Sequence, residues 1–277
     1  MDPFTLIAIL LFGIFSGALG AMLGLGGGVL MIAFFILALN IPAHQAVALS
    51  LLAVIASSCV GGSVYVKSGL TNIRLSLSLE TFAVTGAISG AVIALILPTL
   101  FTEILLGLVL IYAAFVMLRS PRSEEIVTEK RGLLVPCGEF LDTLEKRVVR
   151  YCPTRMRVGY FVSLLGGGIS GIVGIGGGVI MMPVLNLIMK VPMRAAAATS
   201  NFMVGVTAAA SAFVYFNRGF LELYAAVPTV LGIMAGAYLG TVFLGRTESV
   251  NLKRLLGAVL SFVALLLIMK ALGVISW

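Results

Sequence analysis

Charged residues are scarce in this sequence. Asp, Glu, Lys and Arg make up 10% of its 277 residues, hydrophobic residues make up 60%, and no charged residue occurs between Pro3 and Ala43. A soluble domain needs more polar surface than this, whereas a bilayer core about 30 Å thick accommodates about 20 apolar residues as a helix. The sequence therefore predicts an all-α polytopic membrane protein. Its first residues, MDPFT, lack the basic segment of a signal peptide, so we expect the first helix to remain in the mature protein.

Residues that bind metals or perform chemistry are also few. The chain has three cysteines and one histidine; Cys59 lies in an apolar run, and Cys137 and Cys152 lie in a basic segment without a histidine. This pattern argues against a zinc site and against a disulfide framework. The HExxH and GxSxG motifs are absent, as are paired carboxylates within the apolar segments. We therefore expect a protein that is not an enzyme, with no catalytic residues, no metal and no cofactor.

The positive charge is concentrated in one segment. The net charge is +7, and nine of the 18 Lys and Arg residues fall between Arg119 and Arg157. Basic residues that flank membrane spans mark the cytoplasmic side, so this clustering reflects topology rather than a nucleic-acid surface. We predict a cytoplasmic linker at residues 119–157, contact with membrane lipid and no nucleic-acid partner.

The linker contains a segment with apolar residues at helical spacing. This segment, Glu139–Tyr151, predicts an amphipathic helix on the cytoplasmic leaflet, and docking of a soluble partner is the alternative. The residues on its apolar face are Phe140, Leu141, Leu144 and Val148.

An eight-residue motif occurs twice. GLGGGVLM at residues 24–31 returns as GIGGGVIM at residues 174–181, with six identical positions and two Leu-to-Ile exchanges. The same offset of 150 residues continues without a gap for more than eighty residues; it pairs Pro42 with Pro192, for example. We therefore predict a first transmembrane repeat at 1–118, the linker at 119–157 and a second transmembrane repeat at 158–277.

Apolar runs and turn signals predict ten helical elements, five in each repeat. The turn at Pro42 carries no Lys or Arg, whereas its partner carries Lys190 and Arg194. Because basic residues mark the cytoplasmic side, this switch indicates inverted repeats with an odd number of passages each, which five elements satisfy. The predicted helices are 4–20, 29–40, 44–66, 75–97 and 102–118, then 159–171, 179–190, 194–217, 222–244 and 252–272.

Each glycine motif precedes a short helical element. The element at 29–40 is about 18 Å long at 1.5 Å per residue, which is short for a full span. With the helix before it, it predicts a helical hairpin bent at glycines, which tolerate positive φ. Breaks inside a membrane must be buried in protein or line a cavity, and matched breaks in two inverted halves indicate the substrate site of a transporter.

The chemistry of that site follows from what surrounds the motifs. No Asp, Glu, Lys or Arg lies near either one, so helix N-termini must supply the positive charge that holds an anion. The alternative is that the glycines serve only close helix packing, as we expect for Gly13 with Gly17 and for Gly232 with Gly236 and Gly240. The predicted backbone ligands are Gly26, Gly27, Gly28, Gly176, Gly177 and Gly178.

The next helix of each half carries polar residues at matching depth. Hydroxyl and amide donors there are suited to completing the coordination of an anion. The alternative is ordinary hydrogen bonding between helices. These candidate ligands are Ser50, Thr199, Ser200 and Asn201.

The glycine motif, a following proline and a Thr-Ser pair, arranged in two halves, resemble the sulfite exporter TauE/SafE family. The second half carries them as GIGGGVIMMP, ending at Pro183, and as Thr199-Ser200. The resemblance covers nearly the whole chain except the linker, and it implies transport of sulfite or small organosulfonates across the bacterial inner membrane. The first half departs from the pattern with Ala33 and Leu49-Ser50 at the equivalent positions, so the two half-sites are unequal.

These observations predict a secondary transporter that exports small sulfur-containing anions by alternating access. The alternatives are an anion channel of the same architecture and a carrier of other small organic anions, and a homodimer is left open. We expect the acidic residues and the single histidine at helix ends, which favours transport driven by the membrane potential over proton coupling, although the latter stays an alternative. These residues are His44, Glu80, Glu103, Glu222 and Glu248.

Overall fold

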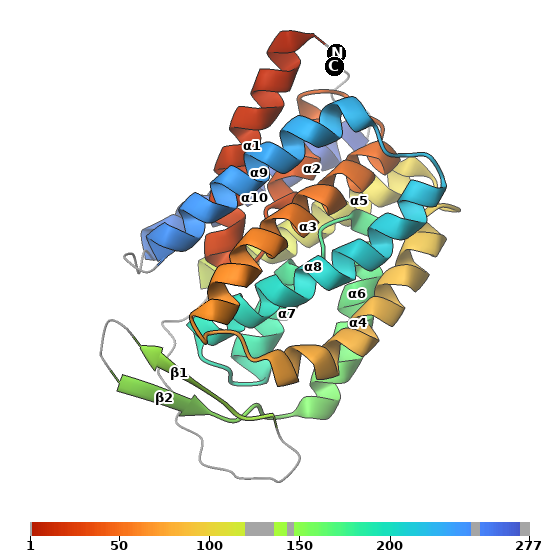
Figure 1. Ribbon diagram of the computed structural model, residues 1–277. Helices are drawn as coiled ribbons and strands as arrows, with labels where there is room; N and C mark the ends of the chain where they lie inside the picture. The colour runs from red at the N-terminus through yellow and green to blue at the C-terminus, as the bar shows by residue number, and fades with distance from the viewer. Residues whose placement is uncertain (1, 120–135, 143–146, 245–249, 272–277) are drawn as a thin grey trace.

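The computed structural model describes residues 2–119, 136–142, 147–244 and 250–271. The described residues form ten α-helices, a short π-helix and a two-stranded hairpin (Figure 1). The first half contains α1 (Pro3–Leu23), α2 (Gly28–Leu37), α3 (Ala43–Lys67), α4 (Ile73–Ala94) and α5 (Thr99–Arg119). The hairpin follows as β1 (Gly138–Asp142) and β2 (Arg147–Tyr151). The second half contains α6 (Met156–Val173), α7 (Gly178–Pro183), the π-helix η1 (Val184–Ile188), α8 (Met193–Asn217), α9 (Leu223–Leu244) and α10 (Val250–Ala271).

The helix lengths suit a membrane. Seven helices within the described residues are long and apolar enough to cross a bilayer, whereas Gly28–Leu37 and Gly178–Ile188 are shorter apolar helices. Large hydrophobic side chains point outward on the long helices; Phe4, Phe161 and Phe213 are each more than 60% exposed. An all-α polytopic membrane protein with a short broken element in each half is therefore confirmed.

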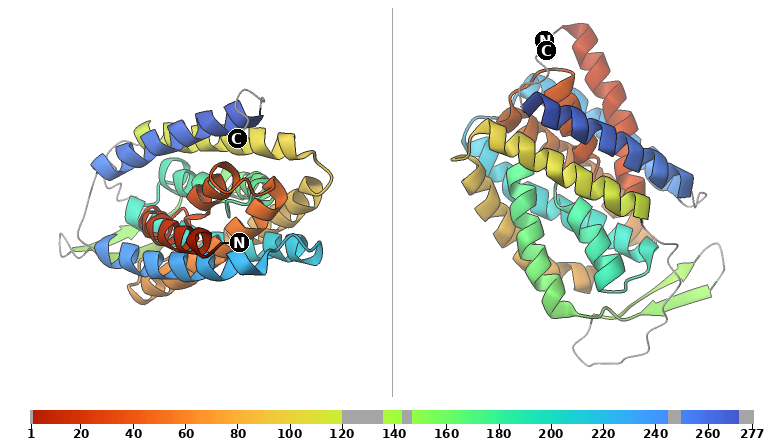
Figure 2. Two further views of the ribbon diagram at one scale, coloured as in Figure 1. Left: turned by 90° about the horizontal axis from the view of Figure 1, so that it is seen from above. Right: turned by 180° about the vertical axis from the view of Figure 1, so that it is seen from behind.

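The two halves pack as inverted copies of each other. Helix α1 packs against α9 and the equivalent α6 packs against α4, while α3 pairs with α8 and α5 with α10. Helix α1 starts at the end that bears the N-terminus and runs toward the hairpin, whereas α6 starts beside the hairpin and runs the other way (Figures 1 and 2). Figure 2 shows α5 and α10 side by side on one face of the bundle.

Equivalent hydrogen bonds close both repeats. The Tyr65 hydroxyl donates to the carbonyl of Ala21 at 2.8 Å, and the Tyr215 hydroxyl donates to the carbonyl of Gly171 at 3.1 Å. The two pairs are separated by the same offset of 150 residues. Each tyrosine is buried, and it ties the third helix of its repeat to the end of the first.

Glycines allow the paired helices to touch at the backbone. A Cβ atom at Gly236 of α9 would overlap the Ile14 carbonyl oxygen of α1, and one at Gly86 of α4 would overlap the Leu164 carbonyl oxygen of α6. Small residues at such crossings let helices approach closely where no hydrophobic effect drives them together. The packing role expected for Gly13, Gly17, Gly232, Gly236 and Gly240 is confirmed.

The linker differs from the prediction. Residues 139–151 do not form an amphipathic helix; the described part is an antiparallel hairpin in which Phe140 pairs with Val149 and Leu141 with Val148. Strand side chains alternate between faces, so Phe140 and Val149 are buried while Leu141 and Val148 are each 58% exposed. The apolar residues fit the spacing of a helix and that of a strand, and the strand is the form that buries Phe140 and Val149 against the bundle. Leu144 lies outside the described residues.

The hairpin docks on the bundle through Asn72 and through a hydrophobic cluster. The Asn72 side chain donates to the Pro136 carbonyl and accepts from the N–H of Leu75, which caps α4. Phe140, Val149 and Tyr151 join a hydrophobic cluster with α4, α7, η1 and α8. Burial raises the pKa of Tyr151 to about 12, against a smaller lowering by the hydrogen bond to Asn72, so its phenol stays neutral.

The expectation of no disulfide is wrong as well. Cys137 and Cys152 form a disulfide, with Cα atoms 4.2 Å apart. In a continuous helix, residues this far apart in sequence lie more than about 20 Å apart, because each residue rises 1.5 Å. The hairpin register instead places them opposite each other, one step beyond the pair Gly138 and Tyr151.

We predict that Gly236→Ala destabilises the fold whereas Gly62→Ala does not. The first substitution places a methyl group against the Ile14 carbonyl, whereas the nearest atom to a Cβ at Gly62 is 3.9 Å away. Overpacking of this kind costs about 1–3 kcal/mol. Thermal unfolding in detergent measures the difference, and equal midpoints for the two variants would contradict the close α1–α9 contact.

Candidate functional site

The two glycine motifs are buried breaks between helices. Gly24 ends α1 with φ at 70°, Gly26 has φ at 75°, and Gly27 precedes α2 with φ at 72°. This left-handed backbone strains residues that carry a Cβ, which explains glycine at these positions. Gly174, Gly176 and Gly177 repeat the conformation before α7, with φ at 78°, 72° and 84°.

The short helices that follow the breaks differ. Helix α2 continues without interruption to Leu37, whereas α7 ends at Pro183 and continues as the π-helix η1. Proline has no N–H and its ring clashes with the preceding turn, which accounts for the change in helical pitch. The departure of Ala33 from Pro183 therefore gives the two halves different backbones after the break.

The two breaks face each other across a pair of valines. A Cβ at Gly26 would lie 3.0 Å from Val204 Cγ1 and 3.1 Å from Val54 Cγ1. A Cβ at Gly176 would lie 2.5 Å from Val54 Cγ1 and 2.6 Å from Val204 Cγ1. Val54 of α3 and Val204 of α8 are equivalent residues of the two repeats, so the motifs meet around the internal two-fold relation.

Serine hydroxyl groups bind the carbonyl groups of the breaks. Ser50 donates to the Gly174 carbonyl at 2.6 Å and Ser200 donates to the Gly24 carbonyl at 3.1 Å, so each serine reaches the glycine motif of the other repeat. Ser16 donates to the Gly27 carbonyl at 2.6 Å. These bonds satisfy the carbonyl groups of Gly24, Gly27 and Gly174, and those of Ser50 and Ser200 link the two repeats.

The first N–H groups of α2 and α7 stay free, whereas the N–H groups of Leu25 and Gly26 donate to the Gly20 carbonyl at 2.9 and 3.2 Å. The first N–H groups of a helix have no partner within it, and no side chain among the described residues caps α2 or α7. The N–H groups of Gly28, Val29 and Leu30, like those of Gly178 and Val179, have no hydrogen-bond acceptor in the described part of the chain. All five residues are buried. With carbonyls bound and N–H groups free, each break presents the positive end of a helix.

Two predicted ligands lie away from the breaks. Thr199 is fully buried, and its hydroxyl oxygen accepts the N–H of Asn72 at 3.1 Å. The Asn201 side chain faces Gly61 of α3, where a Cβ would overlap its nitrogen. Both polar atoms of that side chain are buried without a hydrogen-bond partner among the described residues. The structure thus brings Ser50 and Ser200 to the glycine motifs and places Thr199 and Asn201 at neighbouring contacts.

Ser170 is a polar residue at the second break that the sequence analysis did not identify. It is fully buried, and its hydroxyl group has no partner in the described part of the chain. A Cβ placed on Gly177 would lie 3.6 Å from the Cβ of Ser170 and 3.7 Å from this hydroxyl oxygen. The sequence contains a signal for Ser170 in the comparison of the repeats. The first repeat has Ser16 where the second has Gly166, and the second has Ser170 where the first has Gly20.

Glu80 differs from the expectation of a residue at a helix end. It lies on the third turn of α4 and is 6% exposed. Its carboxyl group meets the hydroxyl group of Thr207 of α8 at 2.7 Å. A single glutamate in an apolar run carries no sequence signal for burial, because burial depends on which helix covers it.

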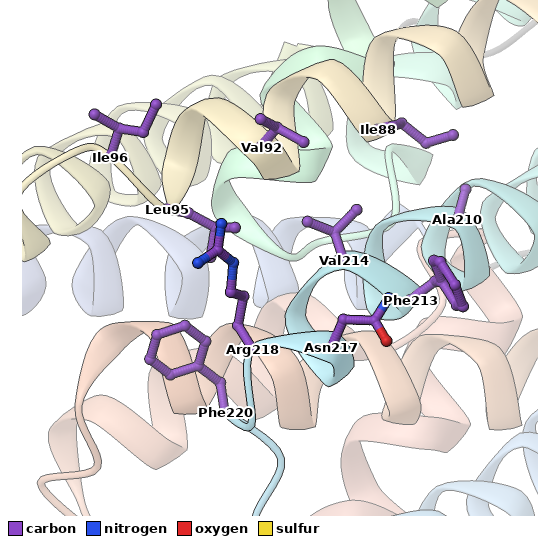
Figure 3. A pocket seen from close by; sticks show the side chains of 10 residues that line it. All are labelled: Ile88, Val92, Leu95, Ile96, Ala210, Phe213, Val214, Asn217, Arg218 and Phe220. Carbon is purple, nitrogen blue, oxygen red and sulfur yellow. The ribbon is translucent and has the colours of Figure 1, made fainter.

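A large groove lies between the ends of α4 and α8. It has a volume of about 970 Å³, and none of the ten predicted site residues lines it. Figure 3 shows its walls of Ile88, Val92 and Phe213, with the Arg218 side chain extending toward Leu95. Arg218 is the one charged residue of the lining and gives this end of the bundle a positive charge.

Inverted repeats with buried helix breaks at matching positions are characteristic of membrane transporters that hold their substrate between the repeats. Comparison with known proteins agrees with this class. Residues 9–267 match the family described as Sulfite exporter TauE/SafE, and the chain belongs to that family. Its members are membrane transporters rather than enzymes.

Two relatives extend over nearly the whole chain. The probable membrane transporter protein YunE of Bacillus subtilis (strain 168) is 21% identical over 271 residues, which cover 95% of this chain and 97% of the relative. The probable membrane transporter protein YdhB of the same organism is 24% identical over 249 residues, which cover 90% and 92%. No solved structure matches the chain.

We predict that Ser50→Ala and Ser200→Ala each destabilise the protein, because each leaves a buried carbonyl group of the opposite break unpaired. An unsatisfied buried acceptor costs about 1–3 kcal/mol. Ser63→Ala is the matched control, since Ser63 is an exposed serine of α3 whose hydroxyl group binds only the Val60 carbonyl of its own helix. Unfolding in detergent should rank the control near the wild type; three equal midpoints would refute the cross-repeat role.

Proposed function

We propose that this protein is a secondary transporter that moves small sulfur-containing anions, sulfite or organosulfonates, outward across the bacterial inner membrane by alternating access. The observation that carries the proposal is the pair of breaks at which buried backbone N–H groups are free while the carbonyl groups are bound. Membership of the family supports a sulfur anion as the substrate.

The breaks favour an anion for electrostatic reasons. Aligned peptide dipoles place about half a positive charge at a helix N-terminus. Helix α2 has ten residues and the helical segment Gly178–Ile188 has eleven, so both are long enough to have this dipole. A sulfite or sulfonate group has several acceptor oxygens around one sulfur atom and can accept N–H groups from two sides.

The proposed ligands fall into two groups. We place the anion on the backbone N–H groups of Gly27 and Gly28 and of Gly176, Gly177 and Gly178. Gly26 borders the site, because its N–H group donates to the Gly20 carbonyl here. Ser50 and Ser200 position the breaks through their bonds to carbonyl groups, and their oxygens remain able to accept but not to donate a second bond. Thr199 and Asn201 complete the site only after α8 shifts, because they face α4 and α3 here.

Alternating access is supported by the closed contact between the breaks. Val54 and Val204 fill the space between Gly26 and Gly176, and both valines are buried. A carrier passes through closed states of this kind, whereas a channel needs a continuous path. Separation of the repeats on one side at a time would expose the breaks to that side.

The outward direction follows from the membrane potential. An inside-negative potential favours the exit of an anion by about 2.3 kcal/mol per elementary charge per 100 mV.

We predict that Gly177→Ala reduces sulfur-anion flux at least tenfold in proteoliposomes at a fixed potential. Its φ of 84° strains any residue with a Cβ, by about 1–2 kcal/mol, and the new methyl group would contact Ser170 at the second break. Gly219→Ala is the matched control: its φ is 73° and nothing lies within 4 Å of its Cβ position. It introduces the same backbone strain at a surface turn.

Flux is measured for sulfite, sulfoacetate and acetate. Saturable flux of the two sulfur anions that survives Gly219→Ala and is lost in folded Gly177→Ala supports the site. Equal flux of acetate would indicate a carrier of small organic anions in general. Single-channel currents in place of saturable flux would indicate a channel, and no flux of any anion would contradict the proposed function.

We also propose that the linker is cytoplasmic, which its nine Lys and Arg residues support. Disulfides persist in oxidising compartments, whereas cytosolic thiols are kept reduced. Cys137 and Cys152 are then two free thiols in the cell, and they form the disulfide when the protein is oxidised.

Thiol labelling distinguishes the two sides. In a Cys59→Ala background, a membrane-impermeant maleimide should label Cys137 and Cys152 in inside-out vesicles without a reductant, and should leave them unlabelled in spheroplasts. Labelling in spheroplasts only after reduction would instead place the hairpin and its disulfide outside. Cys59 is replaced because it is the free cysteine and is exposed.

A further inference from the structure

Glu80 is a buried carboxyl group with one unpaired oxygen. Its Oε1 atom lies 2.7 Å from Thr207 Oγ1, whereas its Oε2 atom is buried and has no hydrogen-bond partner in the described part of the chain. Helices α4 and α8 belong to different repeats, so the contact spans the interface that must change in alternating access.

Counting hydrogens shows which form of the carboxyl group fits. The Thr207 hydroxyl oxygen also lies 3.1 Å from the Met203 carbonyl oxygen. A hydroxyl group has one hydrogen and cannot donate to two acceptors. Both contacts are hydrogen bonds when Glu80 carries a proton and donates it to Thr207, which then donates to Met203. An ionised carboxylate would instead leave its charge buried, with one oxygen lacking any hydrogen bond to offset the loss of water.

The charged groups around Glu80 do not compensate an ionised form. Thr207 is the hydrogen-bond partner of its carboxyl group, and no ion pair to Glu80 occurs within the described residues. Helix α6, the other neighbour of α4, carries an exposed arginine in its first turn and a tyrosine whose ring stacks on Phe82. The titratable residues on these three helices are Arg74 of α4, Arg157 and Tyr160 of α6, and Arg194 and Tyr215 of α8.

The internal repeat shows that the fold does not require a carboxyl group here. The offset of 150 residues pairs Glu80 with Val230 of α9, and Thr207 with Ser57 of α3. Val230 is a partly buried residue of the main hydrophobic cluster, and the Ser57 hydroxyl group has no partner in the described part of the chain. The α4–α8 crossing therefore carries a carboxyl group bound to a hydroxyl group, while the equivalent crossing of α9 and α3 has valine in place of the carboxyl group.

Glu80 is also near the proposed site. Thr207 follows Val204, the valine packed between the breaks, by three residues, or about 4.5 Å along α8. We propose that Glu80 is a proton-binding site whose occupancy is linked to the anion: a bound anion favours the protonated carboxyl group, and the proton favours binding of the anion. This inference rests on the proposed function.

The linkage has a defined sign. An anion and an ionised Glu80 repel each other across a poorly polarisable interior, so loss of the proton at high pH weakens anion binding. Reciprocity requires that anion binding draws a proton onto Glu80. We expect the affinity to fall on the order of tenfold once Glu80 ionises.

The test uses Glu80→Gln, which is neutral at every pH and similar in shape, and Glu80→Val, which copies Val230. Purified protein in weakly buffered detergent at alkaline pH, where Glu80 has lost its proton, receives methanesulfonate, which stays ionised throughout, and a pH indicator reports proton uptake. We expect uptake by the wild type and none by Glu80→Gln, and anion flux that weakens with rising pH in the wild type only. Equal pH dependence in Glu80→Gln would overturn the inference.

Infrared spectroscopy tests the proton without any anion. The wild type minus Glu80→Gln spectrum at neutral pH should contain the C=O stretch of a protonated carboxyl group, whereas the matched control Glu139→Gln, an exposed glutamate of the hairpin, should not remove it. Absence of that band shows an ionised Glu80 and overturns the inference. Absence of all flux in the wild type contradicts the proposed function and the link to an anion, but leaves the protonated state decided by the spectrum.

Discussion

The need to satisfy backbone polar groups away from water governs this structure. A helix can cross a membrane because its N–H and C=O groups bind each other, and any break must be paired within the protein. Both breaks here are buried, and serine hydroxyl groups donate hydrogen bonds to the carbonyl groups of Gly24, Gly27 and Gly174. Hydroxyl donors satisfy acceptors only. The first N–H groups of α2 and α7 therefore remain without an acceptor among the described residues, and they form a site that attracts negative charge without any basic side chain.

Close packing makes this arrangement possible. The breaks can meet across Val54 and Val204 because the positions around these valines have no Cβ. The same property lets α1 approach α9 and α4 approach α6 at the backbone. Helix packing and anion binding were alternatives for glycine in the sequence. In the structure, glycines such as Gly86 and Gly236 pack helices, whereas Gly26 and Gly176 at the breaks adopt positive φ.

The departures from two-fold symmetry coincide with polar chemistry. Glu80 stands against Val230, Ser170 against Gly20, and Pro183 against Ala33. Each exchange places a polar or backbone-altering residue in one half where the other half is apolar or regular. A transporter built from two equal halves would offer an anion equivalent contacts on both sides. The exchanges at Ser170 and Glu80 add hydrogen-bonding groups at the second break and at the α4–α8 crossing, whereas Ser16, which stands against Gly166, adds one at the first break.

The sequence by itself determined the membrane class, the ten helical elements, the two repeats and the position of both breaks. These features depend on local composition, and the offset between Gly24 and Gly174 is readable without coordinates. Tertiary structure decided the rest. The apolar residues near Phe140 fit a helix or a strand, and docking on α4 and α8 selected the strand, which then brought Cys137 to Cys152. The groups that face Ser50, Asn201 and Glu80 belong to the opposite repeat in each case, so only the packing of the two repeats shows which hydroxyl groups are bound and which carboxyl group is buried.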